Sequence, residues 1–330
     1  MKIYKIIFTN FLILLSIIFL IEFYLFFFKQ NHLEQDSILG WKLKKNLRIE
    51  KLEKDFYGNE YRVNFLTNEH GIISTYNNKN NNKNYEILII GDSFSSDPYV
   101  STDQMWFSQL GKNLKKKYNL DILTNAIGAG GYGSLQQYKL TKILKDKKLI
   151  NPNLIIFQFC SNDFNNNSIE IEKKIGNMNQ YLRRPYLSKD NKIFYDESFL
   201  GKVMRTPILG SSRILNKIIF IYSNNKKKEE INENLINESY LITDKIIEKI
   251  AKLYPNINKF IFNCNEQKND WLKLKSIKNF EIILEVEISI KNAKLENKKI
   301  LFKDGGHYNE LGHKIISNAI FDKIVSESLF

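Results

Sequence analysis

Apolar residues follow two patterns along this chain: short continuous runs, and longer stretches in which they recur at helical spacing. The first pattern predicts strands at Ile87–Ile90, Asp121–Leu123, Leu154–Phe159, Lys259–Asn263 and Phe280–Leu284. A run without polar alternation is typical of a strand buried on both faces of a sheet. The second pattern predicts helices around 106–114, 136–145, 234–254 and 310–326. Strands that alternate with helices predict an α/β fold with a parallel sheet covered on both sides.

Two of the predicted helices have a defined start or a defined buried face. Ser101-Thr-Asp-Gln104 resembles a capping box at the start of the helix that carries Trp106, Phe107, Leu110 and Leu114 on one side. In the last helix we expect one buried face that consists of Leu311, Ile315, Ala319 and Ile320. His313 falls inside that helix and is interpreted as structural.

The N-terminal segment differs from the rest because residues 6–28 are almost uniformly apolar. The segment is long enough to cross a hydrocarbon core of about 30 Å as a helix. It lacks the short apolar region and small-residue site of a cleavable signal peptide, so an uncleaved anchor is favoured over a signal peptide or a buried core helix. Glu22 lies near one end, where it can reach the interface. Lys2 and Lys5 favour a cytoplasmic amino terminus, whereas Lys29 and the lysines at 42–45 reduce the charge asymmetry and leave the orientation open.

These patterns predict three parts of the chain. Residues 1–30 form the anchor, residues 31–84 form an N-terminal extension that ends in an asparagine-rich loop, and residues 85–330 form the main domain. Within the main domain, residues 165–230 interrupt the strand–helix rhythm and are interpreted as an insertion, with a hairpin and a helix after it. We expect this insertion to determine substrate specificity.

Charge and cysteine content narrow the function further. The net charge is +13, but the lysines are scattered and are not interleaved with aromatic residues, so we expect a solvated surface and no nucleic-acid partner. Two cysteines exclude a disulfide scaffold and a zinc site built from several thiolates. We expect Cys160 and Cys264 to be buried free thiols, with a disulfide between them as the alternative. We expect Arg183 and Arg184 to lie on the surface, with a contact to an anionic sugar as the alternative.

Serine, aspartate and histidine occur where a nucleophilic site could form. Ser93 follows the strand 87–90 directly, and Asp304-Gly-Gly-His307 lies near the end of the chain. A serine needs a base within hydrogen-bond reach and a third group that orients the base. His307 suits the role of base, and Asp304 suits the role of its partner. Backbone N–H groups of Ser93 and of a glycine in 125–133, with the amide of Asn162, could hold an oxyanion.

Four blocks of the sequence together resemble the SGNH hydrolases, also called the GDSL esterase/lipase superfamily. They are Gly91-Asp-Ser-Phe94, the glycine-rich segment Asn125–Gly133, Ser161-Asn-Asp163 and Asp304-x-x-His307, and they occur in the order of the family. Leu39-Gly-Trp41 and Asn68-Glu-His-Gly71 are similar to the segment that precedes this domain in membrane-anchored bacterial members. The resemblance spans roughly residues 85–320.

The resemblance implies a three-layer α/β/α flavodoxin-like sandwich with a central parallel sheet of about five strands, behind the N-terminal transmembrane helix. It implies that Ser93 is the nucleophile, His307 the base and Asp304 its partner. It also implies an oxyanion hole formed by Ser93, a glycine and Asn162. Counting from Asn125 selects Gly130, and matching Gly-Tyr-Gly selects Gly131, which we prefer. Cys160 stands where the family often has glycine.

The expected function is therefore a membrane-anchored serine esterase that hydrolyses carboxylic esters, in particular O-acetyl esters on envelope or exported glycans. We expect no cofactor and no metal, a partner that is an ester-bearing glycan, and membrane contact through residues 6–28. A single-pass protein with an extracytoplasmic catalytic domain is the expected setting. The alternatives are an O-acyltransferase that uses the same triad on a polysaccharide and a catalytically silent protein that binds glycan or assembles an export complex.

Overall fold

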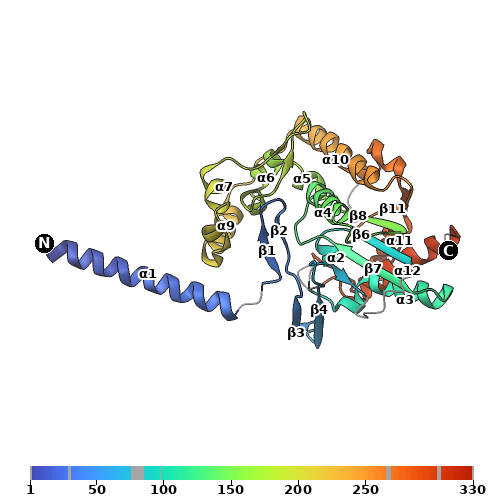
Figure 1. Cartoon of the computed structure of the whole chain (residues 1–330), viewed down its shortest axis with the longest axis horizontal. Coiled ribbons are helices and arrows are strands. Elements are labelled where there is room, and N and C mark those ends of the chain that lie inside the picture. The colour runs from blue at the N-terminus through green and yellow to red at the C-terminus, as the bar shows by residue number, and fades with distance from the viewer. Residues whose placement is uncertain are drawn as a thin grey trace.

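The computed structural model describes residues 2–28, 31–75, 85–96, 98–264, 269–302 and 306–328 (Figure 1). Helix α1 (Lys2–Phe28) projects from one end of a globular part that holds the other elements. Residues Ile3–Leu25 of α1 are long and apolar enough to cross a membrane, and none of them is buried. This helix includes the apolar segment that was predicted at 6–28.

A six-stranded sheet forms the centre of the globular part, in the order β12-β11-β8-β6-β7-β5. Five strands are parallel: β6 (Tyr85–Ile90), β7 (Ile122–Ile127), β8 (Leu154–Phe159), β11 (Asn258–Asn263) and β12 (Glu281–Ile282). The short β5 (Ile73–Ser74) pairs with β7 in the antiparallel direction. Counted along the chain, the parallel strands have the order 2-1-3-4-5 of flavodoxin-like folds, so the predicted fold class is confirmed.

Helices cover both faces of this sheet. Ile87 and Ile89 of β6 join the core cluster on one face, whereas Leu88 and Ile90 join the cluster on the other, because successive side chains point to opposite faces. Helices α3 (Trp106–Tyr118), α11 (Glu285–Leu295) and α12 (Glu310–Ser326) supply the first cluster. Helices α4 (Ser134–Asp146) and α10 (Glu233–Leu253) supply the second, with the 3₁₀ segments η3 (Asn269–Lys273) and η4 (Lys275–Asn279).

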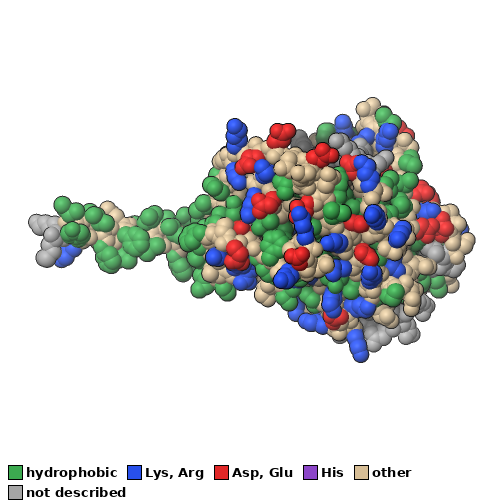
Figure 2. Space-filling model, turned by 90° about the horizontal axis from the view of Figure 1, so that it is seen from above, with side chains coloured by type: hydrophobic (Ala, Val, Ile, Leu, Met, Phe, Trp, Pro, Cys, Tyr) green, Lys and Arg blue, Asp and Glu red, His purple; other side chains and the backbone are tan. Residues whose placement is uncertain are grey.

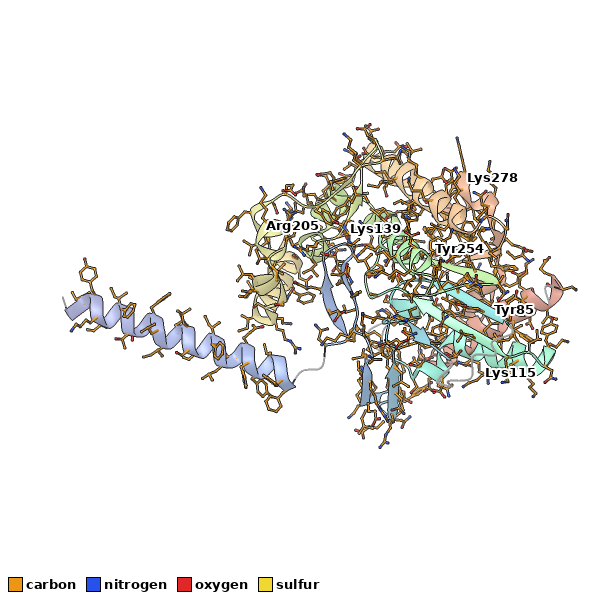
Figure 3. The ribbon with its side chains drawn as sticks, viewed as in Figure 1. Tyr85, Lys115, Lys139, Arg205, Tyr254 and Lys278 are labelled. Atoms are coloured by element: carbon orange, nitrogen blue, oxygen red, sulfur yellow. A yellow bond between two sulfur atoms is a disulfide. The ribbon has the colours of Figure 1, made fainter. Side chains whose placement is uncertain are left out.

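The parallel strands run toward the side of the molecule where α1 is attached. Tyr85, the first residue of β6, lies on the side far from α1 together with Tyr254, which precedes β11 (Figure 3). Arg205 of the insertion lies on the side of α1. The carboxyl ends of the strands therefore face the extension and the insertion, and ligand sites of open α/β sheets lie at these ends.

The extension (31–75 of the described residues) packs against the main domain. It forms two hairpins, β1 (Leu33–Asp36) with β2 (Gly40–Leu43) and β3 (Arg48–Lys54) with β4 (Glu60–Leu66). Trp41, Val63 and Phe65 are buried in the same core cluster as α3 and α12. Since β5 also joins the sheet, the extension and the main domain share one core. The predicted boundary at 84/85 stays a prediction.

The predicted insertion at 165–230 contains a hairpin and several helices. Its elements, with the helix just before it, are α5 (Asp163–Asn166), α6 (Ile169–Ile175), η2 (Met178–Tyr181), β9 (Tyr186–Leu187), β10 (Ile193–Phe194), α7 (Phe199–Met204), α8 (Pro207–Ser211) and α9 (Arg213–Asn225). Strands β9 and β10 form the hairpin. Helix α9 lies beside the last turns of α1 (Figure 1).

Two expectations about helices were wrong in detail. The capping box at 101–104 does not form, because the hydroxyls of Ser101 and Thr102 accept the N–H groups of Asn64 and Leu66 at 3.0 and 2.9 Å. These hydroxyls thus attach the extension to the start of α3. In α12 the buried face is shifted: Leu311 is 41% exposed, and Ile316, Ile320 and Ile324 are buried beside Ala319.

The cysteines also correct an expectation. Cys160 and Cys264 form a disulfide, with their Cα atoms 5.2 Å apart, and so are not free thiols. Both cysteines directly follow adjacent parallel strands, β8 and β11, whose pairing brings their ends together. The bridge joins segments 104 residues apart at the carboxyl edge of the sheet.

Candidate active site

Ser93 begins the short helix α2 (Ser93–Ser96) immediately beyond the carboxyl end of β6. Asp92 shapes this turn, because its carboxylate accepts the N–H of Phe94 at 3.1 Å and its carbonyl accepts the N–H of Ser95 at 3.1 Å. Asp92 is buried, whereas Ser93 is half-buried. The turn therefore leaves the Ser93 side chain accessible at the sheet edge, whereas Asp92, Ser95 and Ser96 are buried.

The end of β7 packs tightly against this turn. Gly128 has a φ of 148°, and a Cβ atom placed on it would lie 2.1 Å from the carbonyl oxygen of Gly91. The N–H of Gly91 is in turn bonded to the carbonyl of Ile127 at 3.0 Å. Only glycine fits at position 128, because any side chain would push the two loops apart. The glycine-rich segment is thus held against the serine turn.

His307 lies beside the residue that follows Ser93. The centroids of its ring and the ring of Phe94 are 5.3 Å apart, and its ring stacks on Tyr99 at 4.6 Å. The next residue, Tyr308, also packs on Phe94 at 5.3 Å, and its hydroxyl donates to the carbonyl of Cys264 at 2.6 Å. These contacts bring the serine turn and the C-terminal block together, although 213 positions separate the two residue numbers 94 and 307. Asp304 lies outside the described residues.

The extension and the insertion hold the glycine-rich loop from outside. The indole N–H of Trp41 donates to the carbonyl of Gly130 at 2.9 Å, and the Arg184 guanidinium donates to the carbonyl of Gly131. Arg184 also lies over the Trp41 ring, 5.1 Å from its centroid. Gly131 has a φ of 73°, which favours glycine. Trp41 and Arg184 thus bond the carbonyl groups of Gly130 and Gly131. The N–H groups of these peptide units are opposite the carbonyls and therefore point away from Trp41 and Arg184.

Arg184 is the clearest residue that sequence reasoning misplaced. It is 1% exposed and pairs with the equally buried Glu172 at 3.2 Å, so the surface interpretation was wrong. Gln136 accepts a second bond from Arg184 at 2.9 Å, and Tyr186 and Asn177 donate to Glu172. Burial raises the pKa of Glu172 to about 7, against the lowering effect of Arg184. A charge pair with this many partners is a structural centre, and an isolated arginine in a sequence gives no sign of it.

Asn162 and Asp163 follow β8, next to the serine turn. Asn162 is half-buried at the surface, and Asp163 is fully buried and accepts the Ser134 hydroxyl at 3.1 Å. Burial, reinforced by the charge of Asp92, raises the pKa of Asp163 well above its ordinary value. Asp163 therefore has a structural role in the site, because Ser134, which donates to it, is the first residue of α4.

A chain of buried hydrogen bonds holds the residues on either side of Ser93 in place. Gln158 donates to the Asp92 carboxylate at 2.8 Å and accepts the Ser95 hydroxyl, which in turn accepts the indole N–H of Trp106 at 3.0 Å. The backbone N–H of Trp106 donates to His313 at 3.2 Å. Burial lowers the pKa of His313 to about 3, so it is neutral and structural, as expected. The polar Gln158 inside an apolar strand was the available sequence signal for this network.

The described residues at the edge of the sheet retain several free hydrogen-bonding groups. Within the described part of the chain, the N–H and hydroxyl of Ser93, the N–H of Gly131 and the side-chain amide of Asn162 make no hydrogen bond to protein. The N–H of Gly130 is equally without a protein acceptor there, so both glycines remain candidates. A hydroxyl and several N–H donors at one sheet edge match what an acyl-transfer site requires.

Two cavities adjoin this edge. A cavity of about 430 Å³ includes Gly130 and Trp41 and is closed on its far side by Gly210, Arg213 and Asn216 of the insertion. Another, of about 400 Å³, includes Ser161 and is lined by Phe164, Ile171, Ile236 and Tyr240. Their volumes are in the range of small-molecule sites.

Comparison with known proteins identifies the family of this chain. A family model described as GDSL-like lipase/acylhydrolase matches residues 87–320. The match covers most of the chain, so the protein belongs to this family. It is accordingly a hydrolase of the SGNH type that acts on ester bonds through a serine. No significant match was found among curated proteins.

Solved structures with a similar arrangement are distant in sequence. The psychrotrophic esterase EstA from a Pseudoalteromonas species is 11% identical with a TM-score of 0.40, over 74% of this chain and 98% of that one. The acetylxylan esterase Axe2 from Geobacillus stearothermophilus is 12% identical with a TM-score of 0.38, over 73% and 94%. A lipase/acylhydrolase from Enterococcus faecalis is 10% identical with a TM-score of 0.37, over 74% and 96%.

Proposed function

We propose that this protein is a membrane-anchored serine esterase that removes acyl groups, in particular O-acetyl groups, from envelope or exported glycans. Ser93 is the nucleophile, His307 the general base and Asp304 the residue that orients it. The observation that carries the proposal is the packing of Phe94 on His307 at 5.3 Å, which puts the serine turn and the histidine side by side. Residues 1–30, 31–84 and 85–330 serve as anchor, extension and hydrolase domain.

The proposed reaction proceeds through an acyl-enzyme. The Ser93 hydroxyl attacks the ester carbonyl while His307 takes its proton, and the tetrahedral oxyanion accepts bonds from the N–H groups of Ser93 and Gly131 and from Asn162. The bond to the sugar oxygen breaks, and His307 protonates the leaving alcohol. Water, deprotonated by His307, then attacks the acyl-enzyme, which releases the carboxylic acid and restores Ser93.

The proposed setting is the outer side of a membrane. Helix α1 is long and apolar enough to span it, and a disulfide at the sheet edge supports an oxidising compartment. The N-terminal lysines would then remain in the cytoplasm, with the hydrolase domain outside.

The test uses the full chain in detergent with a simple acetyl ester and a serine-reactive fluorophosphonate. Ser93→Ala should lose turnover by at least about 1000-fold and should not be labelled. Ser96→Ala is the matched control, since it removes a hydroxyl from the same short helix, where Ser96 donates to the Asp92 carbonyl at 2.6 Å. Labelling of Ser93→Ala at the parent rate would show that the nucleophile lies elsewhere.

A further inference from the structure

The helices α7, α8 and α9 expose apolar side chains that no part of the described chain covers. Phe199 and Ile208 are each 83% exposed, and the other exposed members are Leu209, Ile218, Phe220, Ile221 and Tyr222. Figure 2 shows hydrophobic side chains on the end of the globular part where α1 is attached. Large apolar side chains exposed in this number on neighbouring helices indicate an interaction surface.

The same segment is rich in basic residues. Residues 199–228 contain seven of them, at 202, 205, 213, 217, 226, 227 and 228, and no acidic residue, while Glu197 just before the segment pairs with Lys202 and Arg205 at 3.8 and 3.1 Å. The ammonium group of Lys217 lies 5.0 Å from the centroid of the exposed Phe220 ring, so basic and apolar groups share one surface. Apolar side chains with a basic border are typical of a helix that lies in the headgroup region of a membrane.

Glu22 attaches this segment to α1. Its carboxylate accepts the N–H groups of Arg213 and Ile214 at 2.6 and 3.0 Å and the Ser212 hydroxyl at 3.1 Å, all at the N-terminus of α9. Arg213 also donates to the carbonyl of Leu25. A carboxylate is stabilised at a helix N-terminus, so the single acidic residue of α1 has a partner there.

This attachment fixes the N-terminus of α9 at the level of Glu22 along α1. The apolar sequence of α1 continues for six residues beyond Glu22, to Phe28, which corresponds to about 9 Å along a helix. Tyr24, Phe27 and Phe28 in this stretch are exposed aromatic residues. A bilayer that covers the apolar surface of α1 to its end also reaches the N-terminus of α9.

We propose that α7–α9 form a second membrane-contacting element, which lies in the headgroup region of the bilayer that holds α1. The proposal rests on the membrane anchoring of the proposed function and goes beyond it, because it assigns the insertion a lipid partner. The cavity lined by Trp41, Gly130 and Arg213 shares its wall with this element. The catalytic edge is therefore held at the membrane surface, where its substrate is a glycan ester presented by that surface.

The test measures depth in the full chain, reconstituted in nanodiscs of phosphatidylcholine and phosphatidylglycerol. A single cysteine replaces Ile221 or, as a second position, Ile208, and carries an environment-sensitive fluorophore. Cys160 and Cys264 are buried and bridged and do not react. Leu241→Cys is the matched control, an exposed apolar position in the helix α10, and Leu14→Cys reports the anchor. Quenching uses lipids with a nitroxide near the headgroup or deep in the acyl chain.

We expect the headgroup-level nitroxide to lower the fluorescence at 221 and 208 at least about twofold, with little change at 241. Labels at 221 and 208 that are quenched no more than the label at 241, while the label at 14 is quenched, would overturn the inference. A mass of two chains per disc with unquenched labels would assign the surface to a second copy and would overturn it as well. An unquenched label at 14 would show that α1 is not in the membrane and would overturn the anchor and this inference together. The Ser93→Ala assay tests the hydrolase activity separately.

Discussion

The carboxyl edge of the central sheet and the insertion at 165–230 contribute to the site in different ways. At the sheet edge, Ser93 and Asn162 lie shortly beyond the ends of β6 and β8 and keep groups that can bond a substrate. In the insertion, Arg184 and Glu172 are buried, and their bonds go to other protein groups. The edge thus supplies the groups that the proposed reaction needs, whereas the insertion supports the glycine-rich loop.

The largest effect is expected from the buried ion pair. Arg184→Met leaves Glu172 buried without its cation and should lower the free energy of unfolding by about 3–5 kcal/mol. Arg183→Met is the matched control, because the adjacent side chain is half-buried, and it should change that free energy by less than about 0.5 kcal/mol. Denaturant unfolding in detergent measures both. Equal losses of unfolding free energy in the two variants would show that Arg184 stabilises the insertion no more than the half-buried Arg183 does.

At the sheet edge, Asn162→Ala should lower kcat by about 100- to 1000-fold, the usual loss for one oxyanion donor. The free energy of unfolding should stay near that of the parent, because within the described residues the Asn162 amide bonds no protein group. Asn165→Ala, one turn later, serves as control and should keep its turnover. If Asn162→Ala lowers the free energy of unfolding and leaves kcat unchanged, Asn162 has a structural role and is not an oxyanion donor.

The disulfide between Cys160 and Cys264 is a structural support that lies at the sheet edge itself and not in the insertion. Replacement of both Cys160 and Cys264 by serine should lower the free energy of unfolding by about 2–4 kcal/mol. A reductant should lower the stability of the parent to the level of the double variant and leave the variant unchanged. If the double variant has the same free energy of unfolding as the oxidised parent, the bridge does not contribute to stability in solution.

The smallest effect concerns pH. The pKa of Glu172 is raised from 4.5 to about 7, so the folded state binds this proton more tightly than the unfolded state does. Stability from this group is thus fully present below about pH 4.5, declines as the pH rises to about 7 and is level above. Glu172→Gln should flatten this decline, whereas Glu170→Gln, at an exposed position on the same helix, should not. Unfolding at pH 5 and pH 8 provides the comparison.

The sequence predicted most of the sheet because strands buried on both faces need continuous apolar runs. The predicted strand 154–159 and the predicted helix 310–326 have the bounds that the structure gives to β8 and α12. Strand β5 and helix α11 were not predicted. Strand β5 has only two residues, which is too short for a periodic pattern, and α11 has charged residues spread among its apolar ones.

Local sequence patterns were sufficient to predict an apolar N-terminal helix, an α/β domain, a candidate nucleophile and oxyanion donors after strands, and a candidate base near the end of the chain. Those properties depend on residues close together in sequence. Tertiary packing was needed to show that Arg184 is buried against Glu172, that Cys160 is bonded to Cys264 and that Glu22 caps α9. Each of these contacts joins residues from different elements, so their burial and their partners arise only when the elements pack.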